Sequence, residues 1–358
     1  MANKRTTDME KFIKREEGKM RALILTDLHH GHSISEYFLS YELKLFDWFE
    51  SVKKEYRIDT IINLGDTHDK QMSVNPKVAN LFREKHKQLS VGIDNYYVLA
   101  GNHDCYYKTS NTITTLPLFF KEANQILIET KPLKVGTMCF IPWISPDNIE
   151  EIKKFVNENN RPENTLFCHI EASGFRNGAI TTKHDQLYIS EMDKYKAVYS
   201  GHYHAKQKKG NLTFLGNCFQ KTFGELEHKF LHVLIEDELI PIINENDIFL
   251  RRNIPEGLTT EEIENNVKDF KDKIVQLYIP SSDFDYISKV EMMIEKYRPY
   301  EMTLKTKNII EDTADVEIDN STEDELNEMF LNQMTYPNEK TKNDFQEKFE
   351  FYWKKAEK

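Results

Sequence analysis

Residues 61–69 read Ile-Ile-Asn-Leu-Gly-Asp-Thr-His-Asp, an apolar run that stops at a glycine and is followed by two carboxylates and an imidazole. A short apolar run of this kind is typical of a buried strand. Residues 22–29 and 97–104 repeat the pattern, with Thr-Asp-Leu-His and Gly-Asn-His-Asp after the apolar run. Residues 166–169 end in histidine, and residues 198–204 end in Gly-His-Tyr-His. We expect all five segments to end at one metal site.

The spacing of apolar residues predicts an α/β fold with two sheets flanked by helices. Strand, helix, strand, helix, strand order over residues 22–100 implies right-handed crossovers and a mostly parallel sheet. After Pro117 short strands predominate, which predicts a second, mixed sheet. We expect strands at 22–26, 60–64, 96–100, 125–128, 138–142, 165–169, 196–200, 211–215, 229–235, 274–279 and 300–304, and helices around 38–52, 78–89 and 287–296.

The chemistry of the strand ends favours divalent metal ions. In open α/β sheets, the residues after separate strands converge at the carboxyl edge, although they are distant in sequence. A mixture of imidazole, carboxylate and one amide oxygen suits manganese, iron or zinc. Two such ions about 4 Å apart can share a bridging carboxylate and hold a hydroxide for attack on phosphorus. The pattern therefore predicts a two-metal phosphoryl-transfer site.

Length, charge and cysteine content set limits on function. A chain of 358 residues is expected to form two or three units. It has no apolar stretch of membrane-spanning length and no secretory signal pattern at Met1, so we expect an intracellular protein without a membrane partner. Its four cysteines have no paired spacing and are expected to be reduced structural thiols. A net charge of −11 counts against a surface that grips nucleic acid unaided.

Composition also divides the chain. From Asn244 the pattern changes to a compact α/β unit, and residues 311–320 are acidic and poor in apolar side chains, as in a linker. The expected organisation is an N-terminal extension (1–20), a catalytic domain (21–243), a small α/β domain (244–310), the acidic linker (311–320) and a helical segment (321–358).

The helical segment carries more apolar surface than two short helices can bury against each other. Thr322 and Glu325 have capping-box spacing, and Pro337 ends the first helix. Binding to a partner would cover the apolar stripes, and the alternative is that they pack back onto the domain. The candidate partner-binding residues are Leu326, Met329, Phe330, Phe345, Phe349, Tyr352 and Trp353.

In their order and in their residues, the five segments resemble the motifs of the calcineurin-like metallophosphoesterases, whose pattern is D-x-H, G-D-x-x-D, G-N-H-D, a lone H and G-H-x-H. The resemblance implies two metal ions, with Asp66 as the bridging ligand. It implies that His103 contacts the phosphate and protonates the leaving oxygen, and that Asp69 orients the His103 imidazole. A general acid beside two cations also needs a carboxylate partner to stay protonated near neutral pH. The implied ligands are Asp27, His29, Asp66 and His204 for the first metal, and Asp66, Asn102, His169 and His202 for the second.

A closer resemblance is to the SbcD-type nucleases of double-strand break processing, and especially to the recombination endonuclease subunits of T4-type bacteriophages. It rests on Phe-Ile-Pro-Trp at 140–143, His-Ile-Glu-Ala-Ser-Gly-Phe at 169–175 and Thr-Phe-Gly-Glu at 222–225. The likeness implies a manganese-dependent DNA exonuclease and endonuclease in the cytoplasm, or the host cytoplasm if the chain is phage-encoded. It also implies that residues 244–310 form a capping domain. The segment 321–358 would dock on an SbcC-type coiled-coil ATPase, within a heterotetramer that contains a homodimer of this chain.

Other functions stay open at this point. A phosphatase or small-nucleotide phosphodiesterase could use the same metals, although Lys70 and Asp104 stand where protein phosphatases of this superfamily have Arg and Glu. A non-catalytic scaffold is a third alternative, and the retention of every ligand position argues against it. Lys206, Lys208 and Lys209 follow His204 directly and are either DNA contacts near the site or a solvated hairpin face.

Some positions depart from the family pattern. Many SbcD-type nucleases have histidine where this chain has Asp69, and His68 stands beside it. We expect His30 and His32 to be exposed loop residues. The alternative is that they are extra metal ligands or phosphate contacts. For Asp104 and His68, the sequence favours neither a structural nor a functional role.

Overall fold

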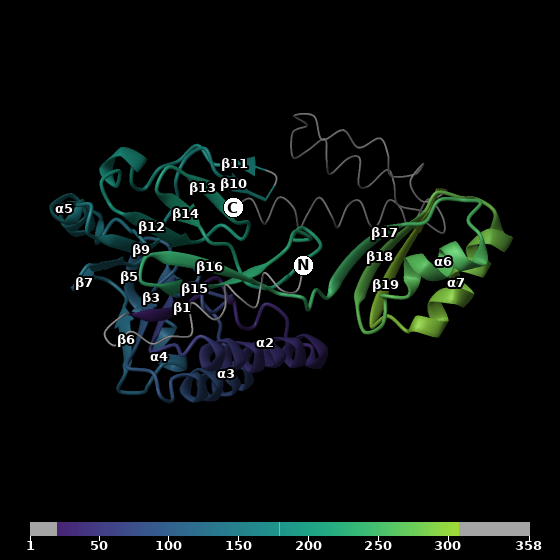
Figure 1. The fold of residues 1–358 in the computed structure, drawn as a ribbon, viewed down its shortest axis with the longest axis horizontal. Helices are drawn as coiled ribbons and strands as arrows, with labels where there is room; N and C mark the ends of the chain where they lie inside the picture. The colour runs from purple at the N-terminus through teal and green to yellow at the C-terminus, as the bar shows by residue number, and fades with distance from the viewer. Residues whose placement is uncertain (1–19, 179, 308–358) are drawn as a thin grey trace, which may run out of the picture.

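The computed structural model describes residues 20–178 and 180–307 (Figure 1). Several predicted features lie outside the described residues. They are nearly all of the N-terminal extension, the acidic linker at 311–320, and the helical segment at 321–358 with its candidate partner-binding residues Leu326, Met329, Phe330, Phe345, Phe349, Tyr352 and Trp353.

The first sheet carries the strands that the opening motifs predict. Four neighbouring strands run parallel and two more extend one edge antiparallel. Leu23 pairs with Ile61, and Ile61 pairs with Tyr96, so the three motif-bearing strands lie side by side and end at the same edge. In spatial order the strands are β16 (Glu238–Ile243), β15 (Phe230–Ile235), β1 (Arg21–Leu25), β2 (Thr60–Asn63), β3 (Asn95–Leu99) and β6 (Gln125–Ile128).

The second sheet is mixed, as predicted. Its four central strands are parallel, and the strand at each edge is antiparallel to its neighbour. Cys168 pairs with Ser200, so the lone-histidine strand and the Gly-His-x-His strand also end together. The order is β13 (Gln207–Lys209), β14 (Leu212–Phe214), β12 (Ala197–Gly201), β9 (Thr165–His169), β8 (Met138–Ile141) and β7 (Leu133–Val135).

The two sheets pack face to face and helices cover their outer faces. Between the sheets lies a buried apolar layer that includes Ile24 and Ile62 from the first sheet and Phe140 and Phe167 from the second. A second layer joins the first sheet to three helices on its outer side (Figure 1). A third layer joins the second sheet to a helix and loops on the opposite side. The helices are α2 (Glu36–Glu55), α3 (Pro76–Leu89) and α4 (Leu116–Phe119) on the first sheet, and α5 (Ile149–Asn159) on the second.

Local signals explain where the two long helices begin. The Ser35 side chain accepts a hydrogen bond from the backbone N–H of Phe38 at the start of α2. Asn75 does the same for Lys77 and Val78 at the start of α3, where Pro76 needs no partner for an N–H. Each helix then presents an apolar stripe to the sheet, as the spacing predicts. The two-sheet fold with flanking helices is therefore confirmed.

Residues 249–306 form a separate three-stranded parallel sheet with two helices on one face and an apolar core of its own. Figure 1 shows this unit to one side of the two-sheet sandwich. It touches the sandwich through Tyr37, whose ring stacks on Tyr300 with centroids 3.8 Å apart. Its elements are β17 (Phe249–Asn253), α6 (Thr260–Val267), β18 (Ile274–Ile279), α7 (Phe284–Tyr297) and β19 (Glu301–Thr306).

Short hairpins complete the structure, and some of its elements are absent from the predictions. Strands β7, β13, β16 and β17 and helices α4, α5 and α6 had no predicted counterpart, because short or mixed-polarity runs carry a weak periodic signal. None of the helices among the described residues is both long enough and apolar enough to cross a membrane. The remaining short elements are β4 (Cys105–Tyr107), β5 (Ser110–Thr114), β10 (Arg176–Asn177), β11 (Ile180–Thr181) and the 3-10 helix η1 (Ile189–Glu191).

Candidate metal centre

The loops after the strands present their polar side chains through unusual backbone conformations. Asp27, His29, Asp66 and His202 all have positive φ, at 53°, 46°, 51° and 88°. Residues other than glycine rarely adopt this left-handed region, and such strain concentrates at functional sites. Backbone hydrogen bonds between neighbouring loops hold the conformation, from Asp27 N to Gly65 O at 3.0 Å and from His29 N to Asp66 O at 2.9 Å. The loops after β1 and β2 therefore support each other.

Two glycines allow these loops to approach closely. A Cβ on Gly101 would lie 2.2 Å from Asp66 Oδ1 and 2.4 Å from Asp66 N. A Cβ on Gly201 would lie 2.3 Å from Thr26 Oγ1 and 2.9 Å from His169 Nδ1. Only glycine fits at such contacts. The glycines of the third and fifth motifs therefore make room for the side chains of the other motifs.

One group of side chains gathers at the ends of β1 and β12. Asp27, His29 and His204 each offer a ligand atom, and these atoms lie within 4.8 Å of one another. His204 Nε2 is 3.2 Å from His29 Nε2, and His29 Nε2 is 4.0 Å from Asp27 Oδ1. These three residues could hold one metal ion.

A second group gathers at the ends of β2, β3, β9 and β12. Asp66, His169 and His202 offer ligand atoms within 4.8 Å of one another. Asn102 Oδ1 lies between the two imidazoles, 2.9 Å from His202 Nδ1 and 3.2 Å from His169 Nε2. Asp66 joins the two groups, because its Oδ2 is 3.5 Å from His29 Nε2 and 3.4 Å from His169 Nε2. The structure thus brings together all seven residues proposed as ligands from the sequence.

The donor set fits two divalent cations. His29 Nε2 and His204 Nε2 face each other, and Asp66 places one oxygen between imidazoles of the two groups. Such convergence of lone-pair donors is unfavourable unless protons or cations lie between them. A set of imidazole, carboxylate and amide oxygen is one that manganese, iron and zinc accept.

Burial and neighbouring charges shift the titration of these groups. Burial alone would raise the pKa of Asp66, but the nearby imidazoles, His169 first, hold it well below its usual range. Burial would lower the pKa of His169, yet the Asp66 carboxylate raises it to about 9. The pKa of His29 falls to about 4, mainly through burial and then through the Lys221 ammonium. Asp66 is therefore held as an anion between the two groups.

His103, the predicted general acid, lies beside these groups. Its backbone N–H donates to Asp66 Oδ1 at 2.8 Å, and its ring lies edge-on to His29 with centroids 4.6 Å apart. Its Nδ1 is 2.6 Å from the backbone oxygen of Asp69. The Asp69 carboxylate instead lies 3.3 Å from His29 Nδ1 and 3.3 Å from His32 Nδ1. The prediction that the Asp69 carboxylate is the partner of His103 is therefore wrong. The chain turns at Asp69 so that its backbone carbonyl, and not its side chain, points toward His103.

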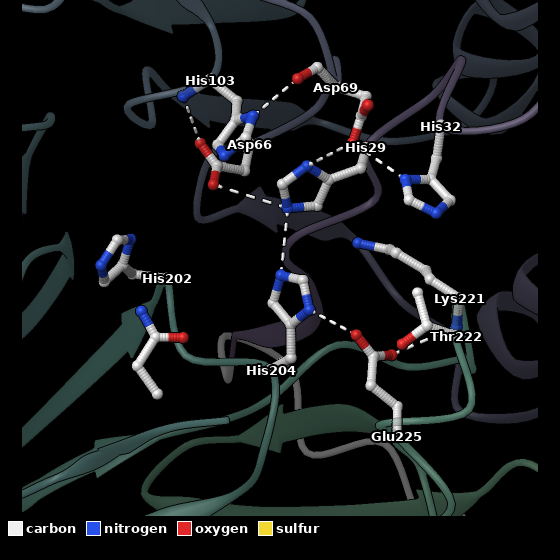
Figure 2. A pocket seen from close by; sticks show the side chains of 11 residues that line it. His29, His32, Asp66, Asp69, His103, His202, His204, Lys221, Thr222 and Glu225 are labelled. Atoms are coloured by element: carbon white, nitrogen blue, oxygen red, sulfur yellow. Dashed lines mark hydrogen bonds and ion pairs between the residues drawn. The ribbon is translucent and has the colours of Figure 1, made fainter. Parts of the chain in front are cut away.

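The site opens to solvent through a pocket of about 230 Å³ (Figure 2). Besides residues that the sequence assigned to the metals or to catalysis, its lining includes side chains with no assigned role in the site. These lining residues are His32, Asn177, Lys221, Thr222 and Glu225.

Glu225 is the most connected of the residues that were not predicted to act in the site. Its Oε1 lies 2.6 Å from His204 Nδ1, and its Oε2 accepts hydrogen bonds from Asn217 Nδ2 at 2.9 Å and from Lys221 N at 3.2 Å. The pKa of Glu225 is lowered, because His204 and nearby lysines outweigh the effect of burial. Glu171 has a similar relation to His202, at 3.3 Å from Nε2. Each group of candidate ligands thus has an imidazole that contacts a further carboxylate, as in many metal sites.

These partners had weak signals in the sequence. Glu225 stands in the Thr-Phe-Gly-Glu run that follows the last motif, and Glu171 lies two residues after His169. Nothing in their spacing shows that their carboxylates turn toward a histidine.

The histidines left open have different roles. His30 was expected to be exposed, and this is wrong: it is buried, stacks on Phe82 with centroids 3.8 Å apart, and lies 3.0 Å from Glu42 Oε1. A backbone bridge pairs His30 with His68, and the His30 ring also stacks on Phe46 of α2. His32 is exposed, as expected; it lines the pocket, and its Nδ1 lies 3.3 Å from Asp69 Oδ1. His68 is buried against Phe119.

Asp104 has a structural role at the base of the loops. Its Oδ1 accepts hydrogen bonds from the backbone N–H groups of Thr67 and His68, and its Oδ2 accepts one from Gly101. Burial, with the charge of Asp66, raises the pKa of Asp104 to about 7. Asp104 ties the loop of the second motif to the loop of the third.

The three lysines after His204 lie on and next to β13 and are exposed. They do not line the pocket. The Lys206 ammonium lies over the Phe230 ring, and the Lys209 ammonium lies over the Phe175 ring. The structure therefore places Lys206, Lys208 and Lys209 beside the site rather than in it, and DNA contact stays a prediction.

Comparison with known proteins gives the family of the chain. The family model described as calcineurin-like phosphoesterase matches residues 20–206. "Exonuclease subunit 1" of Enterobacteria phage T4 is 26% identical over 214 residues, which are 58% of this chain and 61% of that protein. The matched part thus spans less than two thirds of that relative. A nuclease named MPE from Pseudomonas putida has 13% sequence identity and a TM-score of 0.29, covering 62% of this chain and 87% of that structure.

Proposed function

Because the chain belongs to the calcineurin-like phosphoesterase family, we propose that it is a two-metal phosphodiesterase that cleaves DNA. The observation that carries the proposal is the convergence of seven candidate ligands, with Asp66 joining the two groups, from strands that are far apart in sequence. The similarity to a T4 protein named as an exonuclease subunit supports DNA as the substrate. The activity would include both exonuclease and endonuclease cleavage.

Asp27, His29, Asp66 and His204 would hold one ion, and Asp66, Asn102, His169 and His202 would hold the other. We propose manganese as the metal at both positions. When bound, such a pair of ions supplies an activated hydroxide and stabilises charge on the phosphate oxygens.

His103 would protonate the leaving oxygen. Its Nδ1 lies 2.6 Å from a backbone carbonyl oxygen, which can only accept, so Nδ1 carries a proton. The Nε2 atom is then left to exchange a proton with the substrate. The backbone N–H of His103 also donates to Asp66, which places the imidazole beside the candidate ligands. Asp69 contributes through its backbone oxygen, and its carboxylate orients His29.

We place the enzyme in a double-strand break repair or recombination complex with an SbcC-type coiled-coil ATPase. The relative named as subunit 1 of an exonuclease supports a multi-subunit assembly. In this proposal residues 244–310 form a capping domain, residues 321–358 dock on the ATPase, and the chain is a homodimer within a heterotetramer. The exposed Lys206, Lys208 and Lys209 would contact the DNA backbone.

The primary test is degradation of linear duplex DNA by the purified protein with manganese, alone and with the ATPase. His103→Ala should abolish cleavage while manganese still binds, because its imidazole transfers a proton and is not among the proposed ligands. Cleavage of p-nitrophenyl phosphate esters without any cleavage of DNA would instead favour a phosphatase or small-nucleotide phosphodiesterase. Absence of all hydrolysis with metal bound would favour a scaffold.

A deletion tests the assembly. Removing residues 321–358 should leave manganese-dependent cleavage by the chain alone and abolish co-elution with the ATPase. Co-elution of the truncated chain with the ATPase would refute the docking role.

A further inference from the structure

Lys221 is an unusual residue in the pocket, since its side chain is buried and charged. Only 4% of the residue is exposed, and lysine is almost never buried without a partner. It follows β14 in the loop that also carries Thr222 and Glu225. Figure 2 shows its ammonium group reaching toward the space between His29, His32 and His204.

The ammonium group has unused hydrogen-bonding capacity. It donates to the backbone oxygen of Asp27, and an ammonium group carries three donors. No other hydrogen bond from Nζ is seen within residues 20–178 and 180–307, although the group lies 5.4 Å from the centre of the Phe219 ring. Up to two N–H donors are therefore available on the pocket side to a ligand that carries oxygen acceptors.

The protein holds Lys221 in place and surrounds it with carboxylates. Burial lowers the pKa of Lys221, and the carboxylates of Glu225, Asp27 and Asp66 offset part of that effect. The backbone N–H of Lys221 donates to Glu225 Oε2 at 3.2 Å, and the other oxygen of Glu225 contacts His204. The same carboxylate thus fixes the lysine relative to a candidate metal ligand.

Lys221 lies beyond residues 20–206, the part that the family model matches. Lys221 is also not one of the seven candidate metal ligands. We propose that Lys221 donates to a non-bridging oxygen of the scissile phosphate and is a catalytic residue of this enzyme. This inference rests on the proposed phosphodiesterase function. The oxygen gains negative charge during attack, and a fixed cation in a water-poor pocket stabilises that charge.

A competing explanation is that Lys221 only holds the Asp27 loop in its left-handed conformation. Loss of the lysine would then weaken metal binding along with activity. If Lys221 binds phosphate, its loss should weaken phosphate binding and the reaction while metal binding persists. Metal affinity and phosphate affinity therefore separate the two explanations.

The test compares Lys221→Met and Lys221→Arg with the matched control Lys273→Met. Lys273 also donates to a backbone oxygen, that of Asp247, but it does not line the pocket. Three quantities are measured: manganese affinity by calorimetry, affinity of the manganese-loaded protein for inorganic phosphate, and kcat/KM for bis(p-nitrophenyl) phosphate and duplex DNA. If Lys221→Met does not unfold cooperatively, Lys221→Gln replaces it.

For Lys221→Met we expect kcat/KM to fall about 10²-fold, the scale of losing one preorganised donor, with weaker phosphate binding and unchanged manganese affinity. Lys221→Arg should recover part of both losses, and Lys273→Met should behave as wild type. A parallel loss of manganese affinity, or unchanged phosphate affinity, would overturn the inference. If the wild type cleaves neither substrate, the proposed function fails, and phosphate binding with and without Lys221 still decides the role of this residue.

Discussion

Replacing Glu225 with glutamine tests how the pocket orients its ligands. The Glu225 carboxylate lies 2.6 Å from His204 Nδ1 and is largely buried. This contact sets which nitrogen of His204 carries the proton and leaves Nε2 to face His29. Glutamine has nearly the same shape but no charge, and its amide can turn a donor toward the imidazole. The change therefore alters the partner of His204 while it leaves the size of the side chain almost constant.

The magnitude follows from the contact. Removing a partner that orients a ligating histidine typically lowers metal affinity or activity 10- to 100-fold, or about 1.4–2.7 kcal/mol. We place Glu225→Gln at the upper end, because the contact is short and Glu225 is also linked to Asn217 and Lys221. Glu171→Gln is the matched variant on the other group. Glu171 lies 3.3 Å from His202, is partly exposed and is shared with His184, so its loss should have a smaller effect.

The assay is calorimetric titration of manganese into the metal-free proteins, followed by kcat/KM on duplex DNA at saturating manganese. Thermal unfolding of the metal-free proteins checks that both variants fold. The expected order of manganese affinity is wild type, then Glu171→Gln, then Glu225→Gln. Wild-type affinity in Glu225→Gln, or a larger loss in Glu171→Gln, would refute the reasoning.

Two further perturbations probe the scaffold. Gly101→Ala would place a Cβ 2.2 Å from Asp66 Oδ1. It should lower the unfolding free energy measured in urea by about 1–3 kcal/mol and abolish manganese binding. Normal manganese binding by this variant would show that the loop can move to make room for the Cβ. Burial lowers the pKa of His86 to about 3, so the unfolded chain takes up its proton first, and stability present above pH 6.5 is lost as the pH falls toward 3. From pH 7 to pH 5, the unfolding free energy of His86→Gln should therefore fall less steeply than that of the wild type, by up to about 1.4 kcal/mol per pH unit. Urea titrations at each pH give these free energies, and an equal dependence on pH in the two proteins would contradict this assignment.

The sequence alone indicated the two sheets and the residues that come together at the ends of their strands. Runs such as Ala22 to Leu25 are apolar on both faces, as expected of strands that are covered on both sides. Parallel strands end at the same edge, so Asp27, Asp66 and Asn102 were expected to be neighbours, and the structure brings them together. These features depend on periodicity and chain direction, which are local properties of the sequence.

Only the tertiary structure decided which neighbours these side chains have. Asp69 was assigned to His103 from its position in a motif, but the loop directs its carbonyl to His103 and its carboxylate to His29. Lys221 and Glu225 follow the last motif by about 20 residues, and their place in the pocket arises because the loop after β14 folds back over the ends of β1 and β12. Side-chain direction in such loops depends on long-range backbone hydrogen bonds and close packing, and the spacing of residues in the sequence predicts neither.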